Sequence, residues 1–310
     1  MRILVTINSY QDLDGPWHNT FKNKGWQIDL ARGPLSEAEL LGMQSAYNGI
    51  ICGEDTINQT VIDHLLPSLK VISKSGVGLD TIDTDHAKSK NISIHTTYGV
   101  NTRSVVEHFI GLTIALLRNF KQYFNETTNA IWTRRFSPQL TGKTLGIIGL
   151  GAVGGLLAQT MHTLGCKILS YDPHAKAIPN FVTQTQDLEQ LLEQSDIIGL
   201  TCALTPETRQ LINSTTLGMM KANAFLVNTS RGDLVHSKDV AIALNKGTLS
   251  GYATDVLDAE PPTNDHPLLS APNCIITPHI ASKTFETSTQ QVTNAVENLI
   301  ESLCVPAQTS

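Results

Sequence analysis

Short apolar runs alternate with longer amphipathic stretches along most of this chain. Each run is rich in Val, Ile and Leu and is bounded by turn-forming residues, which is typical of buried β-strands. The stretches between the runs repeat apolar side chains at helical spacing. A regular alternation of strand and helix predicts βαβ units that are built around parallel sheets.

The alternation occurs in two series, so we expect two α/β domains, and 310 residues are enough to give each domain its own core. In the first series, strands are predicted near Ile3–Thr6, Gln27–Leu30, Gly49–Ile51, Lys70–Ser73 and Ile92–His95. In the second series, strands are predicted near Leu145–Ile148, Ile168–Tyr171, Ile197–Leu200, Phe225–Asn228, Tyr252–Asp255 and Ile275–Thr277.

Two long helices are predicted beside these series. One spans about residues 105–124, and Ser104 with Glu107 fits a capping box at its start. The other spans about residues 284–304. We expect the chain to cross between the domains along the first helix and to return along the second. The predicted domains are therefore a discontinuous one, residues 1–99 with 284–310, and a continuous one, residues 100–283.

The composition is that of a folded protein, with 41% hydrophobic and 16% charged residues. No apolar stretch approaches the roughly 20 residues that cross a bilayer, and the first residues lack the features of a signal peptide. A net charge of −6 argues against nucleic-acid binding. We therefore expect a cytoplasmic protein with no membrane or nucleic-acid partner. The cysteines have no metal-ligand spacing, so we expect reduced thiols and no metal site; they are Cys52, Cys166, Cys202, Cys274 and Cys304.

A glycine-rich turn links the first strand of the second series to an apolar helix. Gly149 suits a tight turn, Gly151 lets the backbone approach a pyrophosphate, and Gly154 allows close packing of helix and strand. The helix N-terminus offers unpaired N–H groups to the phosphates. Asp172 ends the next strand and would accept hydrogen bonds from a ribose, which favours NAD over NADP. FAD is a minor alternative, because FAD sites of this type usually open a chain.

Three later loops, each predicted to follow a strand, carry residues suited to redox chemistry on a 2-hydroxy acid. Arg231 could hold a carboxylate, His279 could exchange the hydroxyl proton, and Glu260 could tune that base. In open α/β sheets, ligands bind at the carboxyl ends of strands, where these loops lie. Taken one at a time, each residue has an ordinary explanation: a surface arginine, a loop histidine bonded to a carbonyl, and a solvated acid.

The segments GLGAVG (149–154), NTSRG (228–232), DVLDAEPP (255–262) and TPHIAS (277–282) resemble the D-isomer-specific 2-hydroxyacid dehydrogenase family in order and spacing. The chain is most similar to the phosphoglycerate dehydrogenase branch. The resemblance implies two doubly wound parallel-sheet domains, a flavodoxin-like substrate domain and a Rossmann NAD domain, joined by two long helices. It also implies a homodimer, with NAD as cofactor and a small anionic 2-hydroxy or 2-oxo acid as substrate.

The resemblance assigns roles to individual residues. Arg231, Glu260 and His279 would be catalytic, and a charged Glu260 would favour the imidazolium form of His279. The implied cofactor contacts are Gly149, Gly151, Ala152, Val153, Gly154, Asp172, Cys202, Ala203, Thr229, Ser230, Asp255, His279 and Ala281. The implied substrate contacts are Lys74, Ser75, Gly76, Val77, Gly78, Asn101 and Arg231.

The segment 74–78 also predicts an anion site by itself, because successive backbone N–H groups in such a turn form a nest. A plain glycine turn is the alternative.

The chain departs from the family at several positions. Phosphoglycerate dehydrogenases typically carry Arg where this chain has Lys74, which puts recognition of a phosphate in doubt. Tyr98 and Ala203 replace the usual prolines. Arg134 and Arg135 lie in a segment that approaches the partner subunit in relatives, and could supply charge there or lie on the surface. The regulatory domain of some phosphoglycerate dehydrogenases is not expected.

The substrate therefore stays open at this point among phosphoglycerate, hydroxypyruvate or glyoxylate, and lactate-like acids. A function of another class is also open: some relatives keep this fold as NADH-sensing corepressors. A structural protein with a vestigial site is a third interpretation.

Overall fold

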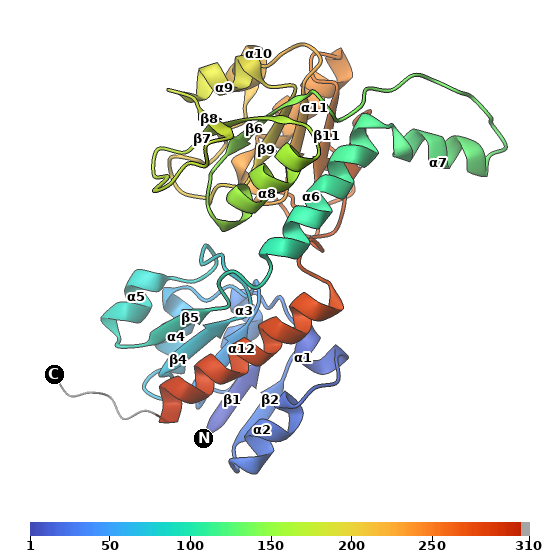
Figure 1. Ribbon diagram of the computed structural model, residues 1–310. Coiled ribbons are helices and arrows are strands. Elements are labelled where there is room, and N and C mark those ends of the chain that lie inside the picture. Colours follow the sequence, from blue (N-terminus) through green and yellow to red (C-terminus); the bar gives the residue numbers. More distant parts are fainter. Residues whose placement is uncertain (305–310) are drawn as a thin grey trace. The chain divides into compact units, whose positions relative to one another are not determined.

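The computed structural model describes residues 1–304, and the chain divides into two compact units (Figure 1). Unit 1 comprises Met1–Asn101 together with the segment that begins at Lys283, and unit 2 comprises Thr102–Ser282. These limits differ by one or two residues from those expected from the sequence. Each unit is built around one parallel sheet, so the predicted fold class is confirmed.

Unit 1 contains a five-stranded parallel sheet in the order β2-β1-β3-β4-β5, which is the flavodoxin-like order. Each strand lies within a residue or so of its predicted position. The strands are β1 (Arg2–Val5), β2 (Gln27–Leu30), β3 (Gly49–Cys52), β4 (Val71–Lys74) and β5 (Ser93–Thr96).

Helices cover both faces of this sheet, because successive side chains of a strand point to opposite faces. In β1, Ile3 and Val5 join an apolar cluster with the long helix α12, whereas Leu4 joins the cluster under α3 and α4. The helices of unit 1 are α1 (Asn8–Asp12), α2 (Trp17–Asn23), α3 (Glu37–Leu41), α4 (Gln59–Leu65), α5 (Thr84–Ser89) and α12 (Phe285–Cys304).

Unit 2 contains a seven-stranded parallel sheet in the order β12-β11-β10-β9-β6-β7-β8. Its chain order reverses between β6 and β9, whose register pairs Leu145 with Ile197. Ligands of open α/β sheets bind at such a switch point. The strands are β6 (Thr144–Ile148), β7 (Lys167–Tyr171), β8 (Val182–Gln184), β9 (Ile197–Leu200), β10 (Phe225–Asn228), β11 (Gly251–Thr254) and β12 (Cys274–Ile276).

Two apolar clusters fill the two faces of the second sheet. Ile147 and Ile197 pack with α6 and α8, whereas their neighbours Ile148 and Ile198 pack into the cluster on the other face. The helices of unit 2 are α6 (Thr102–Leu117), α7 (Phe120–Thr128), α8 (Ala152–Thr163), α9 (Leu188–Gln194), α10 (Ser214–Met219), the 3₁₀ turn η1 (Gly232–Leu234) and α11 (Ser237–Lys246).

The prediction of one helix over residues 105–124 is wrong. Asn119 adopts a left-handed conformation with φ of 52°, which asparagine tolerates better than most residues and which separates α6 from α7. The capping box is also misplaced, because α6 begins at Thr102 and Ser104 lies buried inside its first turn. Strand β8 was not predicted, since Thr183 and Gln184 are exposed and interrupt the apolar pattern.

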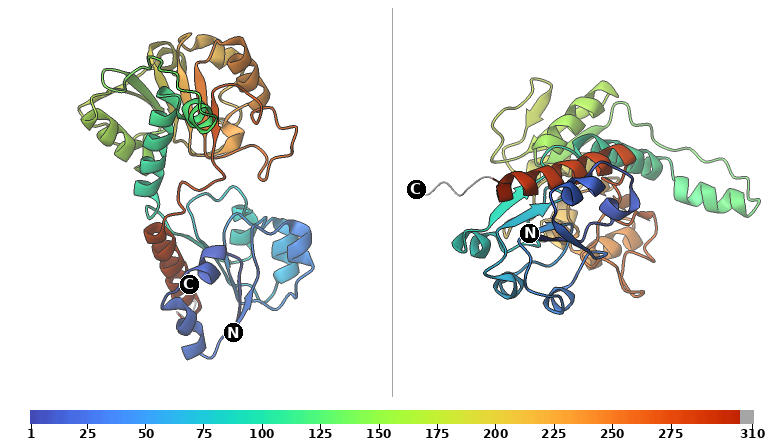
Figure 2. Two further views of the ribbon diagram at one scale, coloured as in Figure 1. Left: turned by 90° about the vertical axis from the view of Figure 1, so that its right-hand side faces the viewer. Right: turned by 90° about the horizontal axis from the view of Figure 1, so that it is seen from below.

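The long helices do not carry the chain between the units as expected. The chain crosses just before each of them, at residues 101–102 and 282–283, and each helix then packs on the sheet of its own unit. In unit 2, α7 and the segment after it project away from the sheet (Figures 1 and 2). None of the side chains of α7 is buried.

Candidate active site

Three loops that carry predicted catalytic residues follow three adjacent strands. Strands β10, β11 and β12 are neighbours in the sheet, so the loops at their carboxyl ends meet at one edge. Arg231 follows β10, Glu260 lies in the loop after β11, and His279 follows β12. The order of the strands thereby brings these three segments together.

An ion pair joins the second and third loops. The Nδ1 atom of His279 lies 2.7 Å from Oε2 of Glu260, and both side chains are partly exposed. The other carboxylate oxygen, Oε1, accepts a hydrogen bond of 2.8 Å from the backbone N–H of Leu257. Glu260 is thus fixed by its own loop while it holds one nitrogen of the imidazole ring, which leaves Nε2 as the nitrogen that can exchange a proton.

Close backbone packing joins the first and second loops. A Cβ atom on Gly232 would lie 1.9 Å from the carbonyl carbon of Leu257, so only glycine allows this approach beside Arg231. Asn228 shapes the same loop, since its Nδ2 donates to the Arg231 carbonyl at 2.8 Å and its Oδ1 accepts from Ser230 at 3.0 Å. The Arg231 loop therefore contacts the Glu260 loop, and the Glu260 loop contacts the His279 loop.

The Asp255 carboxylate binds the loop that carries His279. Its side chain is 1% exposed and accepts hydrogen bonds from Thr277 Oγ1 at 2.6 Å, Ile280 N at 2.9 Å and Ala281 N at 2.7 Å. Burial by itself raises the pKa of this carboxyl, but hydrogen bonds from His108, Thr277 and the two amides outweigh it, and the pKa is lowered. The carboxylate is thus a charged anchor of the loop, in which His279 has a positive φ of 53°.

His108 was missed by the sequence analysis. Its Nε2 lies 2.9 Å from Thr277 Oγ1 and 3.4 Å from Asp255 Oδ1. A signal existed: Ser104, His108 and Leu112 are spaced four residues apart on α6, so they share one helix face, and Ser104 and Leu112 are buried. A polar ring on a buried helix face needs a hydrogen-bond partner.

The glycine turn after β6 has the geometry that dinucleotide binding requires. Gly149 has φ of +95°, and a Cβ atom on Gly154 would lie 2.0 Å from the Gly149 carbonyl oxygen. A Cβ atom on Gly151, the N-cap of α8, would meet no heavy atom of the described chain within 4 Å. At Gly149 and Gly154 the fold itself excludes a side chain. At Gly151 there is room for a ligand at the N–H groups of Ala152 and Val153.

Asp172 lies beside this turn at the end of β7. Its Oδ2 accepts from Leu150 N at 2.7 Å and its Oδ1 from His174 N at 2.8 Å, so the carboxylate is held in place. Cys202, after β9, packs against Gly149, and its carbonyl accepts the Ser230 hydroxyl. Burial raises the pKa of the Cys202 thiol to about 11, so this residue lines the turn as a neutral thiol.

Thr229 gives an independent sign of a bound group. Its Oγ1 is buried and has no hydrogen-bond partner among residues 1–304. Buried hydroxyls are normally satisfied, so an orphaned one beside Ser230 fits a polar ligand that completes it. Together with the open approach to Gly151, it meets a requirement of a site for a polar ligand at this turn.

The expected substrate segment of unit 1 needs two corrections. Lys74 is the last residue of β4 and its side chain is fully buried, with Nζ 3.1 Å from Glu54 Oε2 and 3.3 Å from Thr81 Oγ1. Its ammonium is therefore engaged inside unit 1. In the expected nest, the N–H of Ser75 donates to the Cys52 carbonyl and that of Gly76 to Thr97 Oγ1. Only the amides of Val77 and Gly78 stay candidates for an anion.

The remaining predicted residues have less telling positions. Asn101 is the last residue of unit 1 before the chain crosses, Ala203 is exposed, and Ala281 is buried with its N–H on Asp255. Arg134 is exposed, and Arg135 forms an ion pair of 2.6 Å with Glu126 of α7. Arg135 is therefore already paired at the surface of its own subunit.

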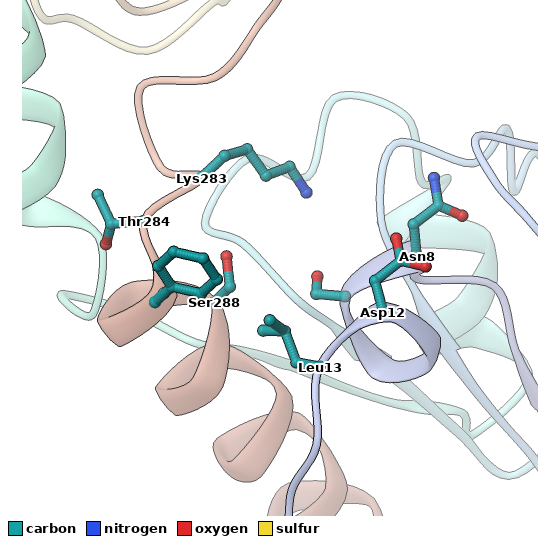
Figure 3. Close-up of a pocket in the computed structure, with 8 residues that line it drawn as sticks. Asn8, Asp12, Leu13, Lys283, Thr284 and Ser288 are labelled. Atoms are coloured by element: carbon teal, nitrogen blue, oxygen red, sulfur yellow. The ribbon is translucent and has the colours of Figure 1, made fainter.

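Unit 1 also contains a hollow of about 290 Å³ between α1 and the start of α12. Figure 3 shows the Lys283 ammonium and the Asp12 carboxylate pointing toward the same space. Asp12 already pairs with Arg32 at 2.6 Å, and none of the predicted site residues lines this hollow. In the described part of the chain, no three His, Cys, Asp or Glu side chains are grouped to hold a metal. Nor is any described helix both long and apolar enough to span a membrane.

Comparison with known proteins agrees with this geometry. Residues 110–281 match the family model "D-isomer specific 2-hydroxyacid dehydrogenase, NAD binding domain". The chain is 37% identical to the glyoxylate reductase of Thermofilum pendens, over 86% of this chain and 81% of that protein.

The chain belongs to the D-isomer-specific 2-hydroxyacid dehydrogenase family. Membership makes it an NAD-dependent dehydrogenase whose unit 2 contains the NAD-binding domain. It is also 35% identical to the D-3-phosphoglycerate dehydrogenase of Methanocaldococcus jannaschii, over 84% of this chain but half the length of that protein. A solved relative, the NAD-dependent formate dehydrogenase of Staphylococcus aureus in complex with NAD, is 26% identical and has a TM-score of 0.88, covering 100% of this chain and 98% of its own.

Proposed function

We propose that the protein reduces a small unphosphorylated 2-oxo acid of the glyoxylate or hydroxypyruvate class to the corresponding 2-hydroxy acid, the D-isomer where the product is chiral, and catalyses the reverse reaction. The observation that carries the proposal is the 2.7 Å pair between His279 and Glu260, on a loop that packs against the Arg231 loop. An acid/base, its carboxylate partner and a guanidinium are the groups that this chemistry needs from a protein.

Each group has a distinct task in the proposed mechanism. The Arg231 guanidinium binds the substrate carboxylate, because its planar fork matches two carboxylate oxygens. Glu260 accepts the hydrogen on Nδ1 of His279, which fixes the ring and leaves Nε2 to give its proton to the 2-oxygen during reduction. When bound, NADH supplies the hydride. In the reverse direction, neutral Nε2 accepts the hydroxyl proton.

We propose that the cofactor occupies the turn after β6. Gly149, Gly151, Ala152, Val153 and Gly154 would hold its pyrophosphate, and Asp172 its ribose. The orphaned Thr229 hydroxyl and the neighbouring residues Cys202, Ala203, Ser230, Asp255 and Ala281 would line the remainder of the site. Because Asp172 is a fixed carboxylate, it would repel a 2′-phosphate, and NADH is the expected coenzyme.

The burial of Lys74 favours an unphosphorylated substrate. The Nζ atom of Lys74 is already paired with the partly exposed Glu54 carboxylate, which would compete with a substrate phosphate for this ammonium. The relatives include both glyoxylate reductases and phosphoglycerate dehydrogenases, and Lys74 is the residue on which we base the choice between the two substrate classes. Within unit 1, we propose the amides of Val77 and Gly78, with Asn101, as contacts for a small anionic substrate.

We also propose that the protein is a homodimer that buries the projecting arm after α6. Large apolar side chains of this arm are exposed, among them Phe124, Ile131, Trp132 and Phe136. Contiguous exposed apolar side chains mark protein–protein contacts. Light scattering after size-exclusion chromatography should give twice the chain mass, and a Trp132→Ser/Phe136→Ser variant should shift it toward the monomer.

A panel of spectrophotometric assays tests the function directly. NADH and NADPH oxidation are measured with glyoxylate, hydroxypyruvate, phosphohydroxypyruvate and pyruvate. The proposal predicts turnover with NADH, and a kcat/KM for hydroxypyruvate above that for its phosphorylated form. A preference for the phosphorylated acid would overturn the assignment of Lys74, equal use of NADPH would overturn that of Asp172, and no turnover of any 2-oxo acid would overturn the function.

A further inference from the structure

We propose that His108 is a positioning residue of the active site, and that it acts through Thr277 on Asp255. The inference rests on the function proposed above, because it concerns the loop that carries His279. His108 lies on α6, outside the four segments on which the resemblance to the family was based. Its ring is partly buried, and all three residues belong to unit 2.

The hydrogen bonds of this chain have a defined direction. The Asp255 carboxyl accepts the N–H groups of Ile280 and Ala281, and hydrogen bonds lower its pKa, so at neutral pH it is ionised and can only accept. The Thr277 hydroxyl, 2.6 Å from Oδ1, must therefore donate its single hydrogen to it. Since that hydrogen is used, the 2.9 Å contact between Thr277 Oγ1 and His108 Nε2 requires the imidazole to donate. The relay runs from His108 to Thr277 to Asp255.

The relay ends on the loop that needs support. His279 has a left-handed backbone with φ of 53°, which a non-glycine residue keeps only where its neighbours fix it. The donors to Asp255 come from residues 277, 280 and 281, on both sides of His279, and the His279 N–H donates to the Asp255 carbonyl at 2.8 Å. His108 fastens this assembly to α6, which packs on β10, β11 and β12.

The relay has a specific chemical requirement, which is a donor at the position of Nε2. The amide nitrogen of glutamine can occupy that position, whereas alanine provides no donor. His108→Gln should therefore preserve the relay and His108→Ala should break it. Glu107→Ala is a matched control, because Glu107 is the adjacent, exposed residue on the same helix.

Two readouts test the proposal, and one of them is independent of turnover. Hydrogen–deuterium exchange of the peptide that covers residues 277–281 should be about tenfold faster in His108→Ala, which corresponds to about 1.4 kcal/mol of lost loop protection. The kcat for the 2-oxo acid should fall by about the same factor, while the Kd of NADH and the KM change less than about threefold. His108→Gln and Glu107→Ala should match the wild type in both.

Thr277→Val provides a second way to break the relay if His108→Ala fails to fold. It removes the hydroxyl that donates to Asp255 as well as the acceptor for His108, so it should show at least the same loss of protection. The double variant should be no worse than Thr277→Val alone, since both substitutions break the same chain of bonds. Unchanged exchange in His108→Ala, additive losses in the double variant, or a His108→Gln as impaired as His108→Ala would each overturn the proposal. If the wild type reduces no 2-oxo acid but the exchange results hold, the proposed function fails and the relay stands.

Discussion

The two units anchor their sheet-edge loops with the same device and use it for different ends. Asp55 in unit 1 and Asp255 in unit 2 are each 1% exposed and each accept a threonine hydroxyl at 2.6 Å. Each also accepts two backbone N–H groups, from Gly53 and Leu35 in the first case and from Ile280 and Ala281 in the second. In both units a buried carboxylate joins loops at the carboxyl ends of parallel strands.

The difference lies in what the anchored loop carries. The loop that Asp255 holds contains His279 with a positive φ, a glutamate partner and a histidine contact from α6. The loops that Asp55 holds contain the cis Gly33–Pro34 bond and lead toward the pair of the buried Lys74 with the partly exposed Glu54. The comparison indicates that a buried carboxylate holds loops together in both units. It contributes to a reaction only where the loop that it holds carries a reacting group.

Replacing the reacting group itself should have the largest effect. His279→Gln removes the proton carrier, so kcat should fall by about 10²–10⁴-fold, the usual contribution of general acid–base catalysis. The Kd of NADH, measured by fluorescence, should stay within about twofold of the wild type, because the cofactor turn is untouched. Near-normal turnover would show that the loop held by Asp255, like the one held by Asp55, has only a structural role.

The two anchors can be compared by matched substitutions. Asp55→Asn and Asp255→Asn each place an amide NH₂ against N–H donors, and should each lower the free energy of unfolding by about 1–3 kcal/mol. Only Asp255→Asn should also lower kcat, by about tenfold for each 1.4 kcal/mol of lost transition-state stabilisation. Urea titration and steady-state kinetics check this. Equal losses of kcat in both variants would erase the functional distinction between the units.

The turns after the first strand of each unit sharpen the same contrast. In unit 1, β1 leads through Thr6 and Ile7 directly into a short helix, whereas unit 2 has a glycine turn. A methyl group on Gly151 would meet open space, so Gly151→Ala should fold normally but weaken NADH binding by about tenfold, a cost of about 1.4 kcal/mol.

Gly155→Ala is the matched control one turn later, where a methyl group also meets open space. It should leave the Kd of NADH unchanged and add a few tenths to about 1 kcal/mol of helix stability. Unchanged NADH binding in Gly151→Ala, measured by isothermal titration calorimetry, would exclude the glycine turn as the pyrophosphate site.

Acid should weaken the stabilisation that the Asp255 carboxylate provides, and this is the smallest effect among the predictions. Burial is the largest single effect on the pKa of Asp255 and raises it. Hydrogen bonds from His108, Thr277 and the two backbone amides together outweigh burial, so the pKa in the folded protein lies below 3.8. Because the folded value lies below the unfolded one, the stabilisation is complete above the unfolded value and disappears as the pH falls through the folded value. Urea midpoints at descending pH should fall more steeply for the wild type than for Asp255→Asn; parallel curves would contradict it.

Most of the fold could be predicted from the sequence because strand periodicity is a local property. The runs Ile197–Leu200 and Phe225–Asn228 are apolar on both faces, as strands covered by two helix layers must be, and both strands form where they were predicted. The break at Asn119 was missed because asparagine is compatible with a helix and with a left-handed turn, so only neighbouring structure chooses.

Less of the site could be predicted than its motifs suggest. The pair of His279 and Glu260 was implied by the family resemblance and is present, whereas the Lys74 side chain, which was expected to contact the substrate, pairs with Glu54. The predicted strand ended at Ser73, whereas β4 includes Lys74 and directs its side chain into the interior. Both faces of β4 are buried, so the pattern of residues does not show whether the Lys74 ammonium meets solvent or a neighbouring carboxylate.

The amino-acid sequence by itself determined the two βαβ series, the glycine turn and the order of the three loops, because each depends on neighbours along the chain. The tertiary structure alone decided that a helix histidine, His108, contacts Thr277 and Asp255, and that the buried Lys74 pairs with Glu54. Such contacts arise from packing between distant segments, whose geometry is fixed only when the sheet order has placed them side by side.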